Sequence, residues 1–438
     1  MPTLFQNCTV ITCDENDQIL HGGLLIDGDR IVGVGPPEAL AATAGPNLVV
    51  EDLAGRWLMP GLVQTHIHLV QTLFRGLADD LALLDWLAQR IWPLERAHDL
   101  DSVYWSARLG LSELLLGGTT AVLDMGTVDH TDAVFEAARE AGLRAHIGKA
   151  MMDLENPAGL SESTEQSLRS SMDLRDRWHG QGHLRYAFAP RFVPSCTEAL
   201  LRETAAEARR TGCLLHTHAS ENLDEVALVR QMHGTENVLY LDQVGFSGPD
   251  VVLAHCVHLN DSEVASLAAR GTVVAHCPSS NLKLASGIAD IPRLLERGVH
   301  CTIGADGAPC NNRLDAFTEM RLAALLQKPR HGPRAMPART ALRMATVEGA
   351  RALGVHAGVL AAGRRADLIE LDPDVLSGWG GGDPISAIVY ALGPSAVRRV
   401  WVGGALRVAD GAVVGWDGGE TVRGCRQALA RVRVRAGL

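Results

Sequence analysis

Two histidines separated by one residue are the first feature of this chain that could do chemistry. They end the segment Pro60–His68, in which the apolar residues Leu62 and Val63 are typical of a buried strand. Residues i and i+2 of a strand point to the same side, so His66 and His68 aim their imidazoles at one point. Converging imidazoles suit a cation such as zinc, although an isolated His-x-His pair is weak evidence for a metal site.

Further histidines and acids stand at the ends of three later apolar runs. They are His216, His218 and Glu221 in the run 213–221, His255 in the run 251–258, and Asp306 in the run 301–308. Any one of them alone is explained by a hydrogen-bonded core residue or a turn. Four such strand ends in one chain instead indicate an active site built around a metal.

The runs that carry these residues alternate with helical patterns, such as 131–140 and 197–210, along the middle of the chain. Eight β/α units of this kind predict an α/β fold, a (β/α)8 TIM-like barrel, with catalytic groups at the C-terminal ends of the strands. The predicted strands cover 60–66, 119–125, 143–150, 183–189, 213–219, 251–256, 272–277 and 301–306.

Both ends of the chain have a different texture. Residues 4–58 alternate like β-strands between Gly and Asp turns, and Asp27-Gly28 is a hairpin signal. The same pattern returns near the C-terminus, in 366–372 and 397–408. We therefore expect a small β-sandwich domain built from both chain ends. The expected boundaries are 1–58 for its N-terminal part, 59–358 for the barrel, and 359–438 for its C-terminal part with a terminal helix.

Composition narrows the class of protein. The 438 residues are 47% hydrophobic and 21% charged, and the formal net charge of −11 argues against nucleic-acid binding. Nine cysteines without paired spacing favour reduced thiols. The N-terminus does not resemble a signal peptide, and no apolar run approaches the roughly 18 residues of a membrane helix. We expect a cytoplasmic homo-oligomer, a dimer or tetramer, that binds neither nucleic acid nor membranes.

These motifs resemble the amidohydrolase superfamily, and within it the mononuclear-metal aminohydrolases that act on nitrogen heterocycles. The resemblance covers nearly the whole chain, from Gly55 to about Asp372, with the split β-domain around it. Together the motifs are highly specific for the superfamily. They are Pro60-Gly-Leu-Val-Gln-Thr-His66-Ile-His68, His218-Ala-Ser-Glu221, His255-Cys-Val-His258, Pro278-Ser-Ser-Asn-Leu-Lys and Gly304-Ala-Asp306-Gly-Ala.

The resemblance implies four ligands for one metal ion per chain: His66, His68, His218 and Asp306. Zinc is expected, with Fe²⁺ and Mn²⁺ as alternatives because imidazole and carboxylate suit several divalent ions. The metal would lower the pKa of a bound water to about 7 and create hydroxide. Glu221 would then move a proton from water to a ring nitrogen, His255 would orient the hydroxide, and Asp306 would help protonate departing ammonia.

Lys149 bears on the number of metal ions. Related hydrolases of cyclic amides bridge two metals with a carboxylated lysine, usually at the end of the fourth barrel strand. The fourth predicted strand, 183–189, has no lysine, and Lys149 ends the third. One metal ion is therefore expected.

Substrate-binding positions resemble two kinds of deaminase. The segments around Trp86 and Glu95 are similar to deaminases of 5′-deoxyadenosine, methylthioadenosine and S-adenosylhomocysteine, in which the glutamate matching Glu95 holds ribose hydroxyls. The middle of the chain is instead similar to guanine deaminase, in which residues matching Gln71, Arg191 and Phe192 contact the purine.

Two departures from the nucleoside deaminases bear on the substrate. Those enzymes carry His where this chain has Arg191, and the arginines that pair with the amino-acid carboxylate of S-adenosylhomocysteine are not evident. The motif around Asp306 is nevertheless of the nucleoside type. We predict a metal-dependent hydrolytic deaminase of a purine nucleoside, of the 5′-deoxyadenosine or methylthioadenosine type, that releases ammonia.

The alternatives are a deaminase of guanine, another aminopurine or a pterin, and then an s-triazine hydrolase. A non-catalytic scaffold that uses the same barrel is disfavoured. All four ligand positions are filled, and both Glu221 and His255 are present.

Overall fold

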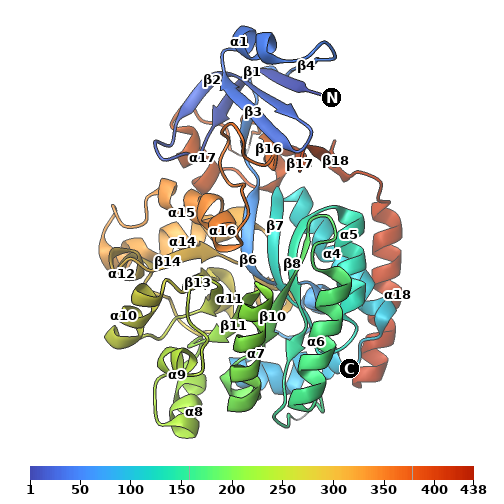
Figure 1. The fold of residues 1–438 in the computed structure, drawn as a ribbon, viewed down its shortest axis with the longest axis vertical. Coiled ribbons are helices and arrows are strands. Elements are labelled where there is room, and N and C mark those ends of the chain that lie inside the picture. The colour runs from blue at the N-terminus through green and yellow to red at the C-terminus, as the bar shows by residue number, and fades with distance from the viewer. Residues whose placement is uncertain (157, 377) are drawn as a thin grey trace.

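Two sheets organise the fold, and helices surround the larger of them (Figure 1). The computed structural model describes residues 1–156, 158–376 and 378–438. The larger sheet consists of parallel strands and forms the barrel. Its strands are β6 (Leu62–His68), β7 (Thr119–Met125), β8 (Arg144–Gly148), β9 (Ala150–Met151), β10 (Leu184–Pro190), β11 (Leu214–Ala219), β12 (Val251–His255), β13 (Val273–His276), β14 (His300–Ile303) and β15 (Asp306–Gly307).

The predicted (β/α)8 barrel is confirmed, and seven of the predicted strands agree with the structure within two residues at each end. The eighth, predicted as 301–306, is in fact split into β14 and β15. Only β15 pairs with β6, with Asp306 opposite Ile67, and this pairing closes the barrel. Between the two pieces, a Cβ on Gly304 would lie 2.7 Å from the carbonyl oxygen of His66, so the close approach requires glycine.

Helices cover the outside of the barrel, and their ends follow local capping chemistry. The Thr197 side chain accepts a hydrogen bond from the Leu200 N–H at the start of α7, and Gly212 ends that helix in the left-handed conformation. The helices predicted over 131–140 and 197–210 are confirmed as α5 and α7. The main helices are α4 (Leu100–Leu116), α5 (Thr131–Ala141), α6 (Thr164–Trp178), α7 (Glu198–Thr211), α8 (Leu223–His233), α9 (Asn237–Gln243), α10 (Asp261–Arg270), α12 (Ile291–Glu296), α14 (Ala316–His331), α15 (Ala338–Met344), α16 (Val347–Ala352), α17 (Pro384–Tyr390) and α18 (Gly418–Ala436).

Short helices follow several barrel strands and shape the end of the barrel at which those strands finish. A 3-10 helix, η1, directly follows β6, and a run of three short helices comes after it. These segments are η1 (Leu69–Phe74), α2 (Leu83–Trp86), η2 (Leu87–Ile91) and α3 (Trp92–Arg96), with α11 (Pro278–Lys283) after β13 and α13 (Ala308–Asn311) after β15.

The second sheet is built from both ends of the chain, as expected, and lies above the barrel in Figure 1. Antiparallel pairing of β5 with β16 joins the two ends. The hairpin expected at Asp27-Gly28 connects β2 and β3. The strands are β1 (Thr3–Ile11), β2 (Ile19–Asp27), β3 (Arg30–Gly35), β4 (Val49–Asp52), β5 (Trp57–Pro60), β16 (Leu368–Leu371), β17 (Val397–Val402), β18 (Ala405–Ala409) and β19 (Ala412–Val413). The domain boundaries remain a prediction.

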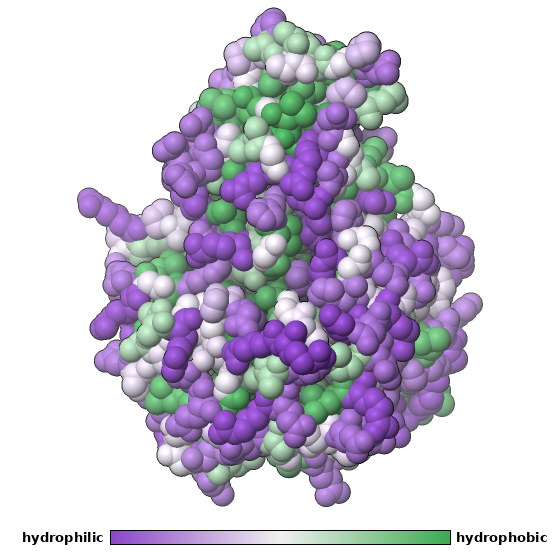
Figure 2. Space-filling view, viewed as in Figure 1, coloured by the Kyte–Doolittle hydropathy of each residue, from purple (hydrophilic) through white to green (hydrophobic). Residues whose placement is uncertain are grey.

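The polarity of the surface and the state of the cysteines agree with the expectations drawn from the amino-acid composition. On the face shown in Figure 2, polar residues dominate over the barrel, and apolar residues gather towards the sheet of the chain ends. Among the described helices, none combines the length and apolarity needed to cross a membrane. All nine cysteines are buried free thiols.

A buried ion pair ties the barrel to the second sheet. Arg144, on β8, donates two hydrogen bonds to Asp367, at 2.9 and 3.0 Å. The Asp367 carboxylate also accepts the backbone N–H of Gly403 at 2.6 Å. The two charged side chains are 9% and 1% exposed, so each depends on the other for its charge to be tolerated.

We expect Asp367→Ala to lower the free energy of unfolding by about 3–5 kcal/mol, because the Arg144 charge would stay buried without a partner. Urea denaturation followed by circular dichroism measures this change. Glu136→Ala, which breaks the exposed Arg139–Glu136 pair, is the control and should cost less than about 1 kcal/mol. An equally small loss for Asp367→Ala would show that water solvates Arg144 instead.

Candidate functional site

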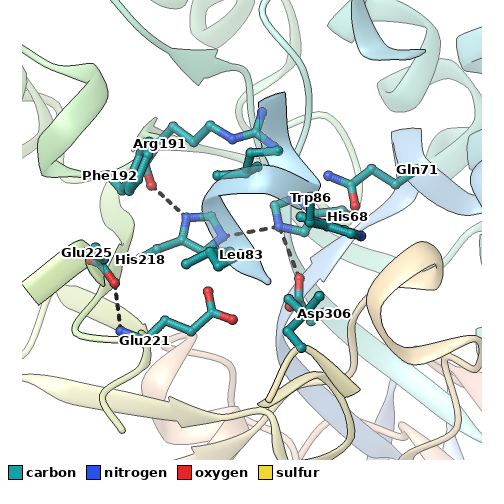
Figure 3. A pocket seen from close by; sticks show the side chains of 12 residues that line it. His68, Gln71, Leu83, Trp86, Arg191, Phe192, His218, Glu221, Glu225 and Asp306 are labelled. Carbon is teal, nitrogen blue, oxygen red and sulfur yellow. Dashed lines mark hydrogen bonds and ion pairs between the residues drawn. The ribbon is translucent and has the colours of Figure 1, made fainter. Parts of the chain in front are cut away.

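The predicted metal ligands meet at the end of the barrel where the parallel strands finish. His66 and His68 come from β6, His218 from β11 and Asp306 from β15, and one potential ligand atom from each lies within 4.8 Å of the others. Figure 3 shows His68, His218 and Asp306 side by side at the floor of a pocket. Three of the four strand ends named from the sequence therefore meet in this cluster.

The distances within this cluster match those of a metal coordination shell. His68 Nε2 lies 3.2 Å from His218 Nε2, and Asp306 Oδ1 lies 3.3 Å from His66 Nε2 and 3.2 Å from His68 Nε2. A tetrahedral site with metal–ligand distances of about 2.0–2.1 Å has edges of about 3.3–3.4 Å. Three of the six ligand–ligand distances are therefore close to the edges of such a site, and all six are no longer than 4.8 Å.

Neighbouring groups orient each imidazole through its other nitrogen. The Nδ1 atoms of His68 and His218 donate to the carbonyl oxygens of Met125 and Arg191, at 2.7 and 2.6 Å. Because a carbonyl only accepts, both rings carry their proton on Nδ1 and present the Nε2 lone pair to the cluster. His66 Nδ1 contacts His216 Nε2 at 2.9 Å, and His66 Nε2 has no hydrogen-bond partner in the described chain.

Burial sets the charge state of these ligands. It lowers the pKa of His66 to about 4 and that of His218 well below its usual value. Burial alone would raise the pKa of Asp306, but the neighbouring His66 and His68 lower it well below its usual range. Neutral imidazoles and an ionised carboxylate are the forms that bind a metal.

Glu221 and His255 lie beside the cluster. His255 Nε2 is 3.5 Å from Glu221 Oε2 and 3.8 Å from Asp306 Oδ2. Burial raises the pKa of Glu221 to about 7, where a carboxyl group can both give and take a proton near neutral pH. Glu221 and Asp306 together raise the pKa of His255 even though its burial opposes this.

The backbone is strained where the strands end at the cluster. Ser220, His255 and Asp306 all adopt left-handed conformations, with φ of 52°, 73° and 61°. Residues with a Cβ avoid this region, and such strain concentrates at functional sites. The turns point Glu221, His255 and Asp306 towards one another.

A pocket with apolar walls opens onto the cluster (Figure 3). Leu83, Trp86 and Phe192 form much of its wall, with Leu87 and Leu284. Gln71 and Arg191 line it together with His68, His218, Glu221 and Asp306. Four of the five predicted substrate-binding residues therefore line this pocket, and the fifth, Glu95, is in contact with two of them.

Glu95 forms a buried network with Arg191 and Gln71. Arg191 donates two hydrogen bonds to the Glu95 carboxylate, at 2.7 and 3.1 Å, and Gln71 Nε2 donates a third at 2.9 Å. Burial alone would raise the pKa of Glu95, but Arg191 lowers it below its usual value, so the carboxylate is ionised. This pairing was not expected from the sequence.

Several residues that support the site were missed in the sequence. Asn281 Oδ1 contacts His255 Nδ1 at 2.8 Å, Ser280 donates to Asp306 at 2.5 Å, and Ser286 donates to Glu221 at 3.1 Å. Ser280 and Asn281 lie in the motif Pro278-Ser-Ser-Asn, which therefore was a usable signal. Glu225 caps its own helix and accepts the Glu221 N–H at 2.7 Å, consistent with the capping pattern Asn-x-x-Glu.

Lys149 lies apart from the cluster. Its Nζ contacts Glu162 at 2.5 Å and Ser170 at 2.8 Å, in a separate cavity that also includes Asp129 and Asp132. These contacts agree with the expectation that Lys149 does not bridge two metal ions.

We expect His218→Ala to reduce bound metal from about one ion per chain to below about 0.1, because a ligand is lost from a four-ligand site. Mass spectrometry of metal content after dialysis against a weak chelator measures this. His258→Ala is the control, because His258 contacts the Ser286 carbonyl and not the cluster, and it should keep its metal. Full metal content in His218→Ala would exclude His218 as a ligand.

Comparisons with known proteins agree with this geometry. The chain is 43% identical over 398 residues, 90% of each protein, to a 5′-deoxyadenosine deaminase of Methanothermobacter thermautotrophicus. It is 41% identical, over 93% of each protein, to a 5-methylthioadenosine/S-adenosylhomocysteine deaminase of Syntrophobacter fumaroxidans. An adenosine deaminase structure from Xanthomonas campestris with bound zinc superimposes with a TM-score of 0.93, at 31% identity, over 99% of this chain and 98% of that one.

The zinc in that structure and the cluster described above together support a metal cofactor for this chain. Residues 57–407 match the amidohydrolase family. With this match and relatives above 40% identity over most of its length, the chain belongs to the amidohydrolase family, as its motifs predicted.

Proposed function

We propose that this protein is a metal-dependent deaminase that removes the amino group of an adenosine derivative, such as 5′-deoxyadenosine or methylthioadenosine, by hydrolysis. The observation that carries the proposal is the cluster of three imidazoles and one carboxylate beside Glu221, at the floor of a pocket with apolar walls. The names of the two most similar relatives described above support the choice of substrate.

His66, His68, His218 and Asp306 would hold one zinc ion per chain. Zinc is favoured because it is the ion bound in the related adenosine deaminase. When bound, the ion would lower the pKa of a water molecule, to about 7 in the case of zinc. This would make a nucleophile available at neutral pH.

Glu221 moves the first proton. Ser286 holds its Oε1 at 3.1 Å, which leaves Oε2 facing His255 and the cluster. A carboxylate with a pKa of about 7 accepts a proton from water and passes it to the neighbouring ring nitrogen of the purine. Ring protonation makes the amino-bearing carbon electrophilic, so attack at that carbon by the deprotonated water becomes favourable.

His255 and Asp306 complete the reaction. Asn281 fixes the His255 ring, so that Nε2 would face the attacking water. From there His255 would stabilise the charge that develops on the oxygen as the tetrahedral intermediate forms. Asp306 Oδ2, which accepts from Ser280, helps to move the remaining proton of the added hydroxyl to the amino nitrogen. The C–N bond then breaks, the amino group leaves as ammonia, and the ring carbon keeps a carbonyl oxygen.

Trp86 and Phe192 would contact the flat purine, which is supported by their position in the pocket wall. A second candidate, deamination of guanine or another aminopurine, is favoured by the position of Arg191 in the pocket, because its guanidinium donates to ring acceptors. The proposed protein is a homo-oligomer. Its net charge of −11 supports the proposal that it binds no nucleic acid, and its nine free thiols support a cytoplasmic location.

Ammonia release from zinc-loaded protein tests the proposal. The substrates are 5′-deoxyadenosine, methylthioadenosine, adenosine, S-adenosylhomocysteine, guanine, a pterin and a chlorotriazine, with chloride followed in parallel. We expect the highest kcat/KM with 5′-deoxyadenosine or methylthioadenosine. Turnover of guanine alone would replace the proposal with the second candidate, and chloride release alone would contradict both.

We expect Glu221→Gln to lower kcat by a factor of about 10²–10⁴, because the amide cannot carry the proton between water and the ring. Its metal content should remain that of the unmodified protein, since Glu221 is not in the cluster. Glu203→Gln, on the exposed side of α7, is the matched control and should keep full activity. Wild-type turnover in Glu221→Gln would refute the proton-transfer role.

A further inference from the structure

The Glu95 carboxylate has no acceptor position left for a substrate. Its Oε1 accepts from Arg191 Nη2 and Gln71 Nε2, and its Oε2 accepts from Arg191 Nη1 and, at 3.3 Å, from the Thr127 hydroxyl. Two carboxylate oxygens offer about four lone-pair positions. The protein's own donors therefore fill all of them.

Arg191 is held in place at both its side chain and its backbone. Its N–H donates to the Met151 carbonyl at 3.1 Å, and its carbonyl accepts from Thr217 and His218. The Arg191 and Glu95 side chains are 4% and 0% exposed. A bidentate ion pair between two buried side chains has no solvent to replace either partner, so it is expected to persist when a substrate enters.

Glu95 also lies behind the pocket surface. Among the described residues that line the pocket, Arg191 and Gln71 are present and Glu95 is not. Figure 3 shows both lining side chains on the side of the pocket opposite Glu221. Gln71 Oε1 is buried and has no hydrogen-bond partner among the described residues, so a free acceptor remains in this wall. Two guanidinium N–H groups of Arg191 donate to Glu95. Among the described residues, no other side chain accepts a hydrogen bond from this guanidinium.

We infer that Glu95 is a positioning residue for Arg191 and does not bind the ribose 2′- and 3′-hydroxyls, and that Arg191 and the Gln71 amide contact the purine or its sugar directly. The inference rests on the proposed function and defines its substrate class. The enzyme takes adenine nucleosides without requiring the ribose diol, so 2′,3′-dideoxynucleosides are substrates alongside ribonucleosides.

The first test compares adenosine with 2′,3′-dideoxyadenosine, which differ only in the diol. We expect kcat/KM values for deamination by the zinc-loaded protein to agree within tenfold. A site built to accept hydrogen bonds from these hydroxyls would reject the dideoxy compound by a far larger factor, on the order of 10⁴. A loss of more than tenfold would overturn the inference and leave the proposed function intact. Failure to deaminate any adenosine derivative would overturn both.

Two variants test the role of the ion pair. Glu95→Gln removes the charge that holds Arg191, so kcat/KM should fall by the same factor for adenosine and for the dideoxy compound. A fall confined to adenosine would show that Glu95 reads the diol. Arg191→His releases Glu95, which can then accept hydrogen bonds from the diol. The ratio of kcat/KM for adenosine to kcat/KM for the dideoxy compound should therefore rise at least tenfold over that of the unmodified protein.

Arg202→His, an exposed arginine paired with Glu198, is the matched control and should leave the preference unchanged. A folded, metal-loaded Arg191→His protein with the original preference would overturn the inference. Should either variant fail to fold, the comparison of the two nucleosides with the unmodified protein still decides the question.

Discussion

The hydrogen bonds to the Nδ1 atoms of the cluster histidines are the interaction on which the site depends. The carbonyl groups of Met125 and Arg191 lie at the ends of β7 and β10, so the barrel backbone itself selects the tautomer of His68 and His218. Each lone pair then points to the same spot. The order of neighbouring strands in the barrel thus controls the protonation of the ligands as well as their position.

Much of the fold was predictable because the barrel repeats one local pattern. Apolar runs between helical segments located seven strands within two residues, and His66, His68, His218 and Asp306 stood where those runs end. The eighth strand was predicted less well. Its division into β14 and β15 depends on the close approach of Gly304 to His66, and no local pattern encodes a contact made over such a sequence separation.

The polar wall of the pocket was the least predictable part. Gln71, Glu95 and Arg191 could each be named as substrate-binding positions from a resemblance, but their mutual pairing could not. Glu95 and Arg191 are 96 residues apart, and their contact depends on how the fold brings α3 to the residue that follows β10. Whether these three side chains contact a ligand or one another depends on their distances in the folded chain, which the sequence does not give. Fold and catalytic cluster are accordingly shared more widely across a family than substrate choice.

The pairing of β5 with β16 has a consequence for the synthesis of this chain. Strand β5 ends at Pro60, and only Gly61 separates it from the strand that carries His66 and His68. Its partner β16 begins at Leu368, so at about 5–20 residues per second the ribosome needs roughly 15–60 s to make it after β5 has been synthesised. During that time one edge of β5, close in sequence to the candidate ligands His66 and His68, lacks its partner strand. Because an unpaired strand edge is a template for pairing with another chain, this edge is a site of aggregation risk until most of the sequence has been translated.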